Sequence, residues 1–269
     1  MMTDLLFTVE NSVAKVTLNR PDSLNAFSEE MIDMWIEALE TVRDSDEIRA
    51  VVVSGNGRAF CAGGDIKEMI AGNGFYKTES DISSTGLARK NSLWNKVQRV
   101  PLLLEEIDKP VIAKVHGIAY GAGLDMALMC DIRIVADDTR FSESYVNVGI
   151  VPGDGGAYFL PKLVGTDHAL DMLWTGKVLG AQEAKDMGLV TYVVPKDELD
   201  SYTDEYLQNI VNGPQQAIRL TKRAVYQSRD MTLRSSLDMI SSFMGIVTEL
   251  EDYQRGVEAV MEKRKAVFE

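Results

Sequence analysis

Polar and hydrophobic positions alternate with a period of two near the N-terminus of the chain. Within residues 7–21, two short runs that contain β-branched residues flank the polar sequence Glu-Asn-Ser, and the second run sets Ala14, Val16 and Leu18 beside polar neighbours. Such alternation is typical of strands with one buried face. We therefore expect a β-hairpin here, and Pro21 to mark its end.

A longer period follows Ser28. The apolar residues after it recur at the spacing of one helix face, at Met31, Trp35, Ala38, Leu39 and Val42. Ser28 can cap this helix, and the two glutamates that come next suit the positive end of its dipole. The pattern therefore predicts an amphipathic helix that starts directly after Ser28.

The middle of the chain combines short apolar runs with glycine-rich turns. Three runs predict buried strands, within residues 50–55, 109–117 and 131–136. Helices are expected at about residues 91–108 and after the glycines near residue 121, whereas residues 71–86 are polar and glycine-rich and predict a loop. The order strand, glycine turn, helix thus occurs twice.

From Thr166 onward the periodicity is mostly helical. The segments with helical spacing are 166–176, 181–189, 202–211 and 214–268, and strand-like runs end by about Val194. We therefore expect an α/β core over residues 1–200 and a helical C-terminal region over residues 201–269.

The composition narrows the classes of partner. The chain has 269 residues, of which 45% are hydrophobic, so it can bury a substantial core. Its formal net charge of -13 argues against duplex nucleic acid or an anionic membrane as partner. An anionic ligand would need a local patch of cations.

Several kinds of site are excluded by what the sequence lacks. Cys61 and Cys130 lack the spacing of a disulfide framework or a zinc site, and there is no P-loop, H-E-x-x-H or G-x-S-x-G motif. The N-terminus has no basic leader, and no apolar run approaches the roughly 20 residues of a membrane span. We expect a soluble, cytoplasmic protein without a metal or redox cofactor.

Two glycine turns, "FCAGGDI" and "YGAGLDM", stand where an apolar strand leads into a helix. Glycine lets a ligand approach the backbone, and N–H groups at a helix start point toward negative charge. Two such turns could hold one oxygen between two N–H donors, as in an oxyanion hole. Tight strand-to-helix packing explains the glycines equally well.

One acid in the second turn needs an explanation. Asp125 is the single carboxylate in the nearly uncharged run 119–130. Burying an ionised carboxylate is costly unless something uses it. A carboxylate that stabilises the helix N-terminus is the alternative, and an acid in that place can do both.

The longer motifs closely resemble the crotonase (enoyl-CoA hydratase/isomerase) superfamily. They are "GNGRAFCAGGDIKEM", "KPVIAKVHGIAYGAGLDMALMCDIRIVADDTRFSES" and "VGIVPGDGGAYFLPKLVG", and the likeness runs in order from "LNRP" to "EKRKAVF". The resemblance implies an α/β fold, a crotonase-like spiral of repeated ββα turns with a helical C-terminal trimerisation region. It also implies an acyl-CoA thioester as substrate, no separate cofactor, and a homotrimer or a dimer of trimers.

By the same resemblance, the oxyanion-hole donors are the N–H groups of Gly64 and Ala122. The hydratases of the family carry two glutamates, which match Asp125 and Tyr145 here. Aspartate has a reach shorter by about one bond, roughly 1.5 Å. Tyrosine keeps a proton donor but offers no base at neutral pH. The usual two-glutamate hydration therefore needs a substitute.

Glu143 and Asp154 are the candidates for that substitute. Glu143 is expected in an extended stretch, where residues two apart share a face, so that it could point the same way as Tyr145. Asp154 is either a second carboxylate of the site or an ordinary turn residue. We expect Asp125 to face the acyl chain and to act as acid or base with one of these partners.

The coenzyme A contacts are also implied by the resemblance. The candidates lie near the first glycine turn and on a C-terminal helix, and they are Asn25, Ala26, Arg58, Ala62, Asp65, Ile66, Lys67 and Lys222. Arg219 and Arg223 are on the same helix face as Lys222. Solvated surface charges are the alternative for each of these cations.

The leading hypothesis is an enzyme that stabilises a thioester enolate, most simply an enoyl-CoA hydratase. A double-bond isomerase, an acyl-CoA hydrolase of the same fold and an acyl-CoA-binding subunit without turnover are the alternatives. The sequence leaves the acyl group and the choice between trimer and hexamer open.

Overall fold

The predicted N-terminal hairpin forms one edge of a six-stranded sheet. The computed structural model describes residues 3–71 and 85–268. The strand order of this large sheet is β1-β2-β3-β4-β6-β9. Its strands are β1 (Leu5–Glu10), β2 (Val13–Leu18), β3 (Ala50–Gly55), β4 (Val111–Val115), β6 (Ile132–Ala136) and β9 (Tyr192–Val194). Only β1 and β2 pair antiparallel; the other neighbours in this sheet are parallel.

A smaller sheet lies beside the glycine turns. It has the order β5-β7-β8, with β5 at Ile118–Tyr120, β7 at Arg140–Ser142 and β8 at Leu179–Gly180. Cys61, after β3, forms a parallel bridge with Ala119 of β5. Each turn of the chain thus contains a long strand, a short strand and a helix, and successive turns stack on one another. This is the expected spiral of ββα turns.

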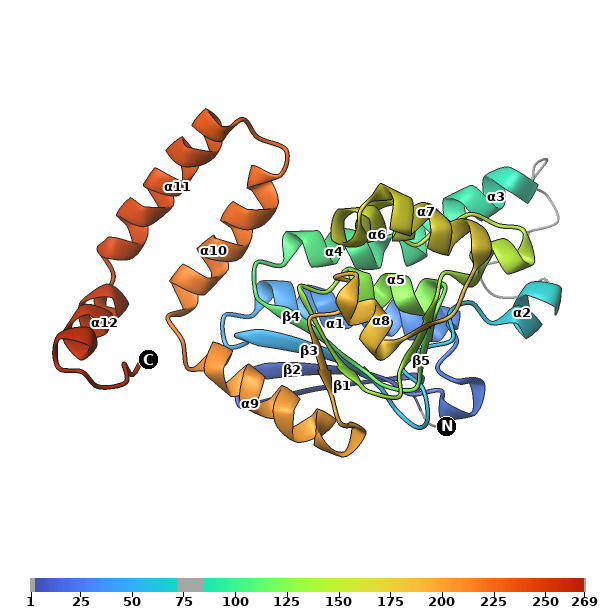
Figure 1. Ribbon diagram of the computed structural model, residues 1–269, viewed down its shortest axis with the longest axis horizontal. Coiled ribbons are helices and arrows are strands. Elements are labelled where there is room, and N and C mark those ends of the chain that lie inside the picture. The colour runs from blue at the N-terminus through green and yellow to red at the C-terminus, as the bar shows by residue number, and fades with distance from the viewer. Residues whose placement is uncertain (1–2, 72–84, 269) are drawn as a thin grey trace.

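The helices cover both faces of the large sheet and extend beyond it (Figure 1). Those in the first two thirds of the chain are α1 (Glu29–Asp44), α2 (Ile66–Ala71), α3 (Thr85–Ser92), α4 (Arg99–Glu106), α5 (Ala122–Leu128), α6 (Gly156–Val164), α7 (Thr166–Thr175) and α8 (Ala181–Asp186). The later helices are α9 (Leu199–Val211), α10 (Gln215–Ser228), α11 (Leu233–Thr248) and α12 (Glu251–Met261).

Alternation along the strands builds two apolar layers. In β3, Val51 and Val53 face the main core together with Trp35 of α1, whereas Ala50 and Val52 face a second cluster with Leu207 of α9. A strand covered on both sides explains why residues 50–53 read as a continuous apolar run. Ser28 caps α1 by accepting a hydrogen bond from the Met31 N–H, as predicted.

The C-terminal helices divide into two parts by their packing. α9 packs on the large sheet, whereas α10 and α11 extend away from the core in Figure 1. The packing therefore changes after Val211 rather than at residue 200. Arg219 and Lys222 of α10 pair with Asp108 and Asp131 of the core, each at 2.8 Å. Within the described residues, no helix is long and apolar enough to cross a membrane.

Some local predictions were wrong or incomplete. The helix expected over residues 91–108 begins at Thr85 and passes through a π-helical turn at Leu93–Val97 before α4. The sequence pattern does not predict α6, whose sequence contains glycine and Pro161. It also does not predict β5, β7 and β8, because strands of two or three residues show no period. Residues 72–84 of the predicted loop lie outside the described residues.

Gly123 holds the two glycine turns together, and its substitution should therefore destabilise the fold. A Cβ atom at Gly123 would lie 2.3 Å from the carbonyl oxygen of Cys61 and 2.7 Å from its Cβ. Overpacking of this kind costs about 1–3 kcal/mol. We expect Gly123→Ala to lower the melting temperature in thermal unfolding by roughly 2–4 °C per kcal/mol lost.

Gly245→Ala is the matched control, because no heavy atom lies within 4 Å of the added methyl group in α11. It should leave the melting temperature unchanged or raise it slightly, since alanine favours a helix over glycine. Equal melting temperatures for the two variants would contradict the tight contact at Gly123.

Candidate active site

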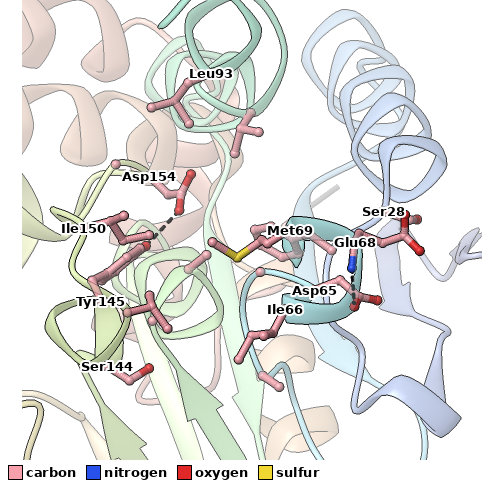
Figure 2. A pocket seen from close by; sticks show the side chains of 18 of the residues that line it. Ser28, Asp65, Ile66, Glu68, Met69, Leu93, Ser144, Tyr145, Ile150 and Asp154 are labelled. Atoms are coloured by element: carbon pink, nitrogen blue, oxygen red, sulfur yellow. Dashed lines mark hydrogen bonds between the residues drawn. The ribbon is translucent and has the colours of Figure 1, made fainter. Parts of the chain in front are cut away.

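A cavity of about 680 Å³ opens where the two glycine turns meet the loop before α6. The first turn contributes Gly64, the second Gly121 and Ala122, and the far wall Tyr145 and Asp154. Figure 2 shows Tyr145 and Asp154 on one side of the cavity and Ile66 and Met69 on the other. Residues far apart in the sequence therefore converge on one space.

Backbone hydrogen bonds join the two glycine turns. The Cys61 N–H donates to the carbonyl of Ile118 at 3.1 Å, and the Tyr120 N–H donates to the carbonyl of Cys61 at 3.0 Å. Gly63, with a φ of 90°, leaves no room for a side chain, because its Cβ would lie 2.6 Å from the Tyr120 carbonyl oxygen. Glycine is thus required for close contact between the turns.

Gly64 and Ala122 present backbone donors at this junction. Both line the cavity, and within the described chain neither N–H donates to a protein acceptor. Ala122 is the first residue of α5, where an N–H has no partner inside the helix. Its helical backbone accepts a side chain, while the positive φ of Gly121, 49°, makes the turn before it. Two donors are therefore available to a ligand oxygen.

Two aspartates and a tyrosine, Asp125, Asp154 and Tyr145, form a buried triad beside these donors. The Tyr145 hydroxyl lies 2.7 Å from Asp125 Oδ2 and 2.8 Å from Asp154 Oδ2. Asp154 lines the cavity and is 8% exposed, whereas Asp125 is 0% exposed and does not line it. The expectation that Asp125 faces the acyl chain is therefore not met, because Tyr145 stands between Asp125 and the cavity.

Glu143 lies on the far side of Asp125 from the cavity. It directly follows β7, and Tyr145 belongs to a 3-10 helix at Ser144–Val148, so the expected extended stretch was wrong. Glu143 is fully buried, and its carboxyl group adjoins that of Asp125. Burial and the neighbouring charge of Asp125 raise the pKa of Glu143 well above its usual value. Glu143 is thus a neutral acid behind the triad.

Burial also raises the pKa of each acid in the triad. Burial and then the charge of Asp154 raise the pKa of Asp125 to about 7. Burial raises the pKa of Asp154 to about 6, although the hydrogen bond from Tyr145 lowers it. The pKa of Tyr145 is well above its usual value, chiefly through burial, so the phenol keeps its proton. Both aspartates therefore titrate near neutral pH, where an acid/base group is most effective.

The predicted coenzyme A residues separate into two groups. Ala62, Asp65 and Ile66 line the cavity. The other five do not: Asn25, Ala26, Arg58, Lys67 and Lys222. Of these, Asn25 is buried and its amide donates to the backbone carbonyls of Ala59 and Phe60, so it shapes the first turn. Lys222 pairs with Asp131 and so anchors α10.

Two arginines at the cavity were missed by the sequence analysis. Arg20 and Arg89 both line it. The Arg20 guanidinium lies 3.3 Å from Asp65 Oδ2, a contact across 45 residues that no local pattern signals. Among the described residues, no group of three or more histidine, cysteine or acidic side chains could hold a metal ion.

Comparisons with known proteins cover the whole chain. The family model of enoyl-CoA hydratase/isomerase matches residues 8–269. The short-chain-enoyl-CoA hydratase of Clostridium acetobutylicum is 34% identical over 98% of this chain and 97% of its own length. The 1,2-epoxyphenylacetyl-CoA isomerase of Escherichia coli is 32% identical over 100% and 99%.

A solved structure agrees in fold. The enoyl-CoA hydratase of Mycobacterium smegmatis superposes with a TM-score of 0.87 at 33% identity, over 98% of each chain. The relatives include both hydratases and an isomerase, so they support the acyl-CoA chemistry of the family without selecting one reaction. The family match and these similarities confirm the resemblance to the crotonases, and the chain belongs to the enoyl-CoA hydratase/isomerase family.

Proposed function

We propose that this chain is an acyl-CoA enzyme that stabilises a thioester enolate, and that it hydrates a 2-enoyl-CoA reversibly. One observation carries the proposal: two unpaired backbone N–H groups share a cavity with a carboxyl group that titrates near neutral pH. A thioester needs both, because its α-carbon becomes reactive only when its oxygen is stabilised.

The N–H groups of Gly64 and Ala122 are the proposed oxyanion donors. The thioester oxygen accepts a hydrogen bond from each, and these bonds strengthen as negative charge develops on the oxygen. Each donor of this kind contributes about 10²–10³ in rate. Because both are backbone groups, Ala122 serves as well as the glycine more usual in the family.

Asp154 is the proposed acid/base group. Its carboxylate removes a proton from water while the water oxygen bonds to the β-carbon and the double-bond electrons move into the enolate. The carboxylic acid so formed then gives the proton to the α-carbon, which restores the carboxylate. A pKa of about 6 suits both steps at neutral pH. Tyr145 orients the carboxylate through the hydrogen bond of 2.8 Å.

A double-bond isomerase is the second candidate. It is favoured by the finding that Asp154 lines the cavity whereas Asp125 and Glu143 do not. One carboxylate can remove a proton from the γ-carbon, which leaves a dienolate on the thioester oxygen, and then return the proton at the α-carbon. Both reactions therefore need the same oxyanion donors and the same Asp154.

The cavity lining also bears on the substrate. Leu93, Ile150 and Val151 give one part of the cavity apolar walls, which suit an aliphatic acyl chain. Arg20 and Arg89 supply cations in an otherwise acidic chain, and we assign them to the anionic coenzyme A part. Asp65 is paired with Arg20 and orders this side of the entrance.

The helices α10–α12 are proposed as the subunit interface of a homotrimer or a dimer of trimers. On α11, Leu233, Leu237, Ile240 and Met244 lie on one helix face and are all exposed, with Leu233 at 75%. A continuous apolar helix face is unfavourable in water unless another chain covers it.

Substitution of Asp154 tests its assigned acid/base role. Asp154→Asn should lower kcat for hydration of crotonyl-CoA by about 10²–10⁴, because the amide cannot accept a proton. KM should change little, since the oxyanion donors and the apolar walls stay in place. The assay is the loss of the ultraviolet absorbance of the enoyl thioester.

Asp197→Asn is the matched control, because Asp197 is exposed and does not line the cavity. It should keep the kinetics of the native protein. Full activity of Asp154→Asn would contradict the assigned role. Double-bond migration without hydration would favour the isomerase, thioester cleavage a hydrolase, and tight binding of the ester without any conversion a binding subunit.

The mass of the protein in solution tests the proposed subunit interface on α11. Light scattering should give a mass of three or six chains, and the double variant Leu237→Asp/Met244→Asp should give smaller species, because two charges would enter the proposed contact. Ser242→Asp, on the opposite side of α11 from this apolar face and also exposed, is the control. A monomeric native protein would contradict the proposed interface.

A further inference from the structure

The triad has more hydrogen-bond acceptors than the tyrosine has hydrogens. The Tyr145 hydroxyl lies within hydrogen-bond distance of both Asp125 and Asp154. A phenol carries one hydrogen and can donate it to one acceptor only. If both aspartates were ionised, one contact would bring an oxygen lone pair against a carboxylate. The geometry therefore requires one more proton, on one of the two aspartates.

Burial indicates which aspartate holds that proton. Asp125 is 0% exposed and lies behind the cavity wall, whereas Asp154 lines the cavity, where solvent or substrate can stabilise its charge. The charged form of a carboxyl group is disfavoured most where desolvation is most complete. Burial is the largest cause of the raised pKa of both aspartates, and the charge of Asp154 raises the pKa of Asp125 further.

The surrounding groups favour the same assignment. Glu143 adjoins Asp125, and burial together with the charge of Asp125 raises the pKa of Glu143 well above its usual value, so Glu143 is neutral. Cys61 faces Asp154 from the first glycine turn, and burial raises the pKa of its thiol to about 12, so it stays neutral. Burial and the charge of Asp154 outweigh the hydrogen bonds that the Glu143 carboxyl group and the Gly156 N–H make to Asp125, so the pKa of Asp125 stays raised.

We propose that Asp125, Tyr145 and Asp154 share one proton in addition to the tyrosine's own, and that Asp125 holds it as a positioning residue that acts on Asp154 through Tyr145. The neutral Asp125 donates to the Tyr145 oxygen, and Tyr145 then donates to the Asp154 carboxylate. This arrangement rests on the proposed function, in which Asp154 must begin as an aligned base. Asp125 itself does not touch the reacting atoms.

Two substitutions at Asp125 distinguish this role from direct acid/base catalysis. The Asp125→Asn side chain still donates to Tyr145 but cannot ionise, so it should keep most of the turnover. Asp125→Leu has a similar size but no donor, and it should lose about tenfold or more through the missing hydrogen bond. KM should change little in both variants, because Asp125 does not line the cavity.

The pH profile gives a readout that a purely structural role would not move. Because the pKa of Asp125 is raised to about 7, its proton is present below that pH and is lost above it. Native turnover should therefore fall as the pH rises through about 7, whereas Asp125→Asn should stay active. A loss of turnover in Asp125→Asn as large as in Asp154→Asn, or an unchanged alkaline limb, would overturn the proposal.

Infrared spectroscopy tests the proton without any turnover. The native protein should show the carbonyl band of a protonated carboxyl group that disappears with a midpoint near pH 7. The band with this midpoint should be absent from Asp125→Asn and retained in Glu143→Gln, whereas the neutral Glu143 adds a second carboxyl band that only Glu143→Gln removes. A band with a midpoint near pH 7 that survives in Asp125→Asn would place the proton elsewhere and contradict the proposal, whether or not the protein hydrates an enoyl-CoA.

Discussion

The close contact between the two glycine turns is the constraint on which the site depends. The Gly123 Cα approaches Cys61 so closely that no side chain fits, and Gly63 meets the second turn in the same way. This contact brings the N–H groups of Gly64 and Ala122 to one cavity, although their residues lie on different turns of the spiral. A backbone fixed by stacked strands needs no reorganisation when charge develops on a ligand, which is the source of oxyanion stabilisation.

The buried acids show how the fold supports an acid/base group at a cost in stability. A buried carboxylate is less stable than the same carboxylate in water, and this cost applies to Asp125, Glu143 and Asp154. Their raised pKa values mean that the folded chain holds protons which the unfolded chain releases near neutral pH, so folding is less favourable there than in mild acid. The same burial places Asp154 where it can both accept and return a proton. Tyr145 links the two aspartates through a phenol whose raised pKa keeps its proton in place. A glutamate at this position would ionise at a lower pH and then could not donate a hydrogen bond.

The sequence predicted what local pattern encodes. Period and capping predicted the hairpin and the helix after Ser28, and the resemblance to the crotonases indicated Gly64 and Ala122, both of which line the cavity. Spacing could not show that Tyr145 stands between Asp125 and the cavity, since that order depends on the 3-10 helix after Glu143. Nor could it show that Lys222 pairs with Asp131, because a cation's partner is chosen by tertiary packing. The sequence thus indicated several residues that line one cavity, whereas their arrangement around it required the structure.

The central claim is that this cavity forms a thioester enolate with Asp154 as the base. Exchange of the α-proton of butanoyl-CoA in heavy water tests it most directly, because a saturated acyl group can be neither hydrated nor isomerised. Mass spectrometry should show one deuterium incorporated at the α-carbon by the native protein, and none above background with Asp154→Asn. Tight binding of butanoyl-CoA without exchange, or exchange that persists in Asp154→Asn, would contradict the account.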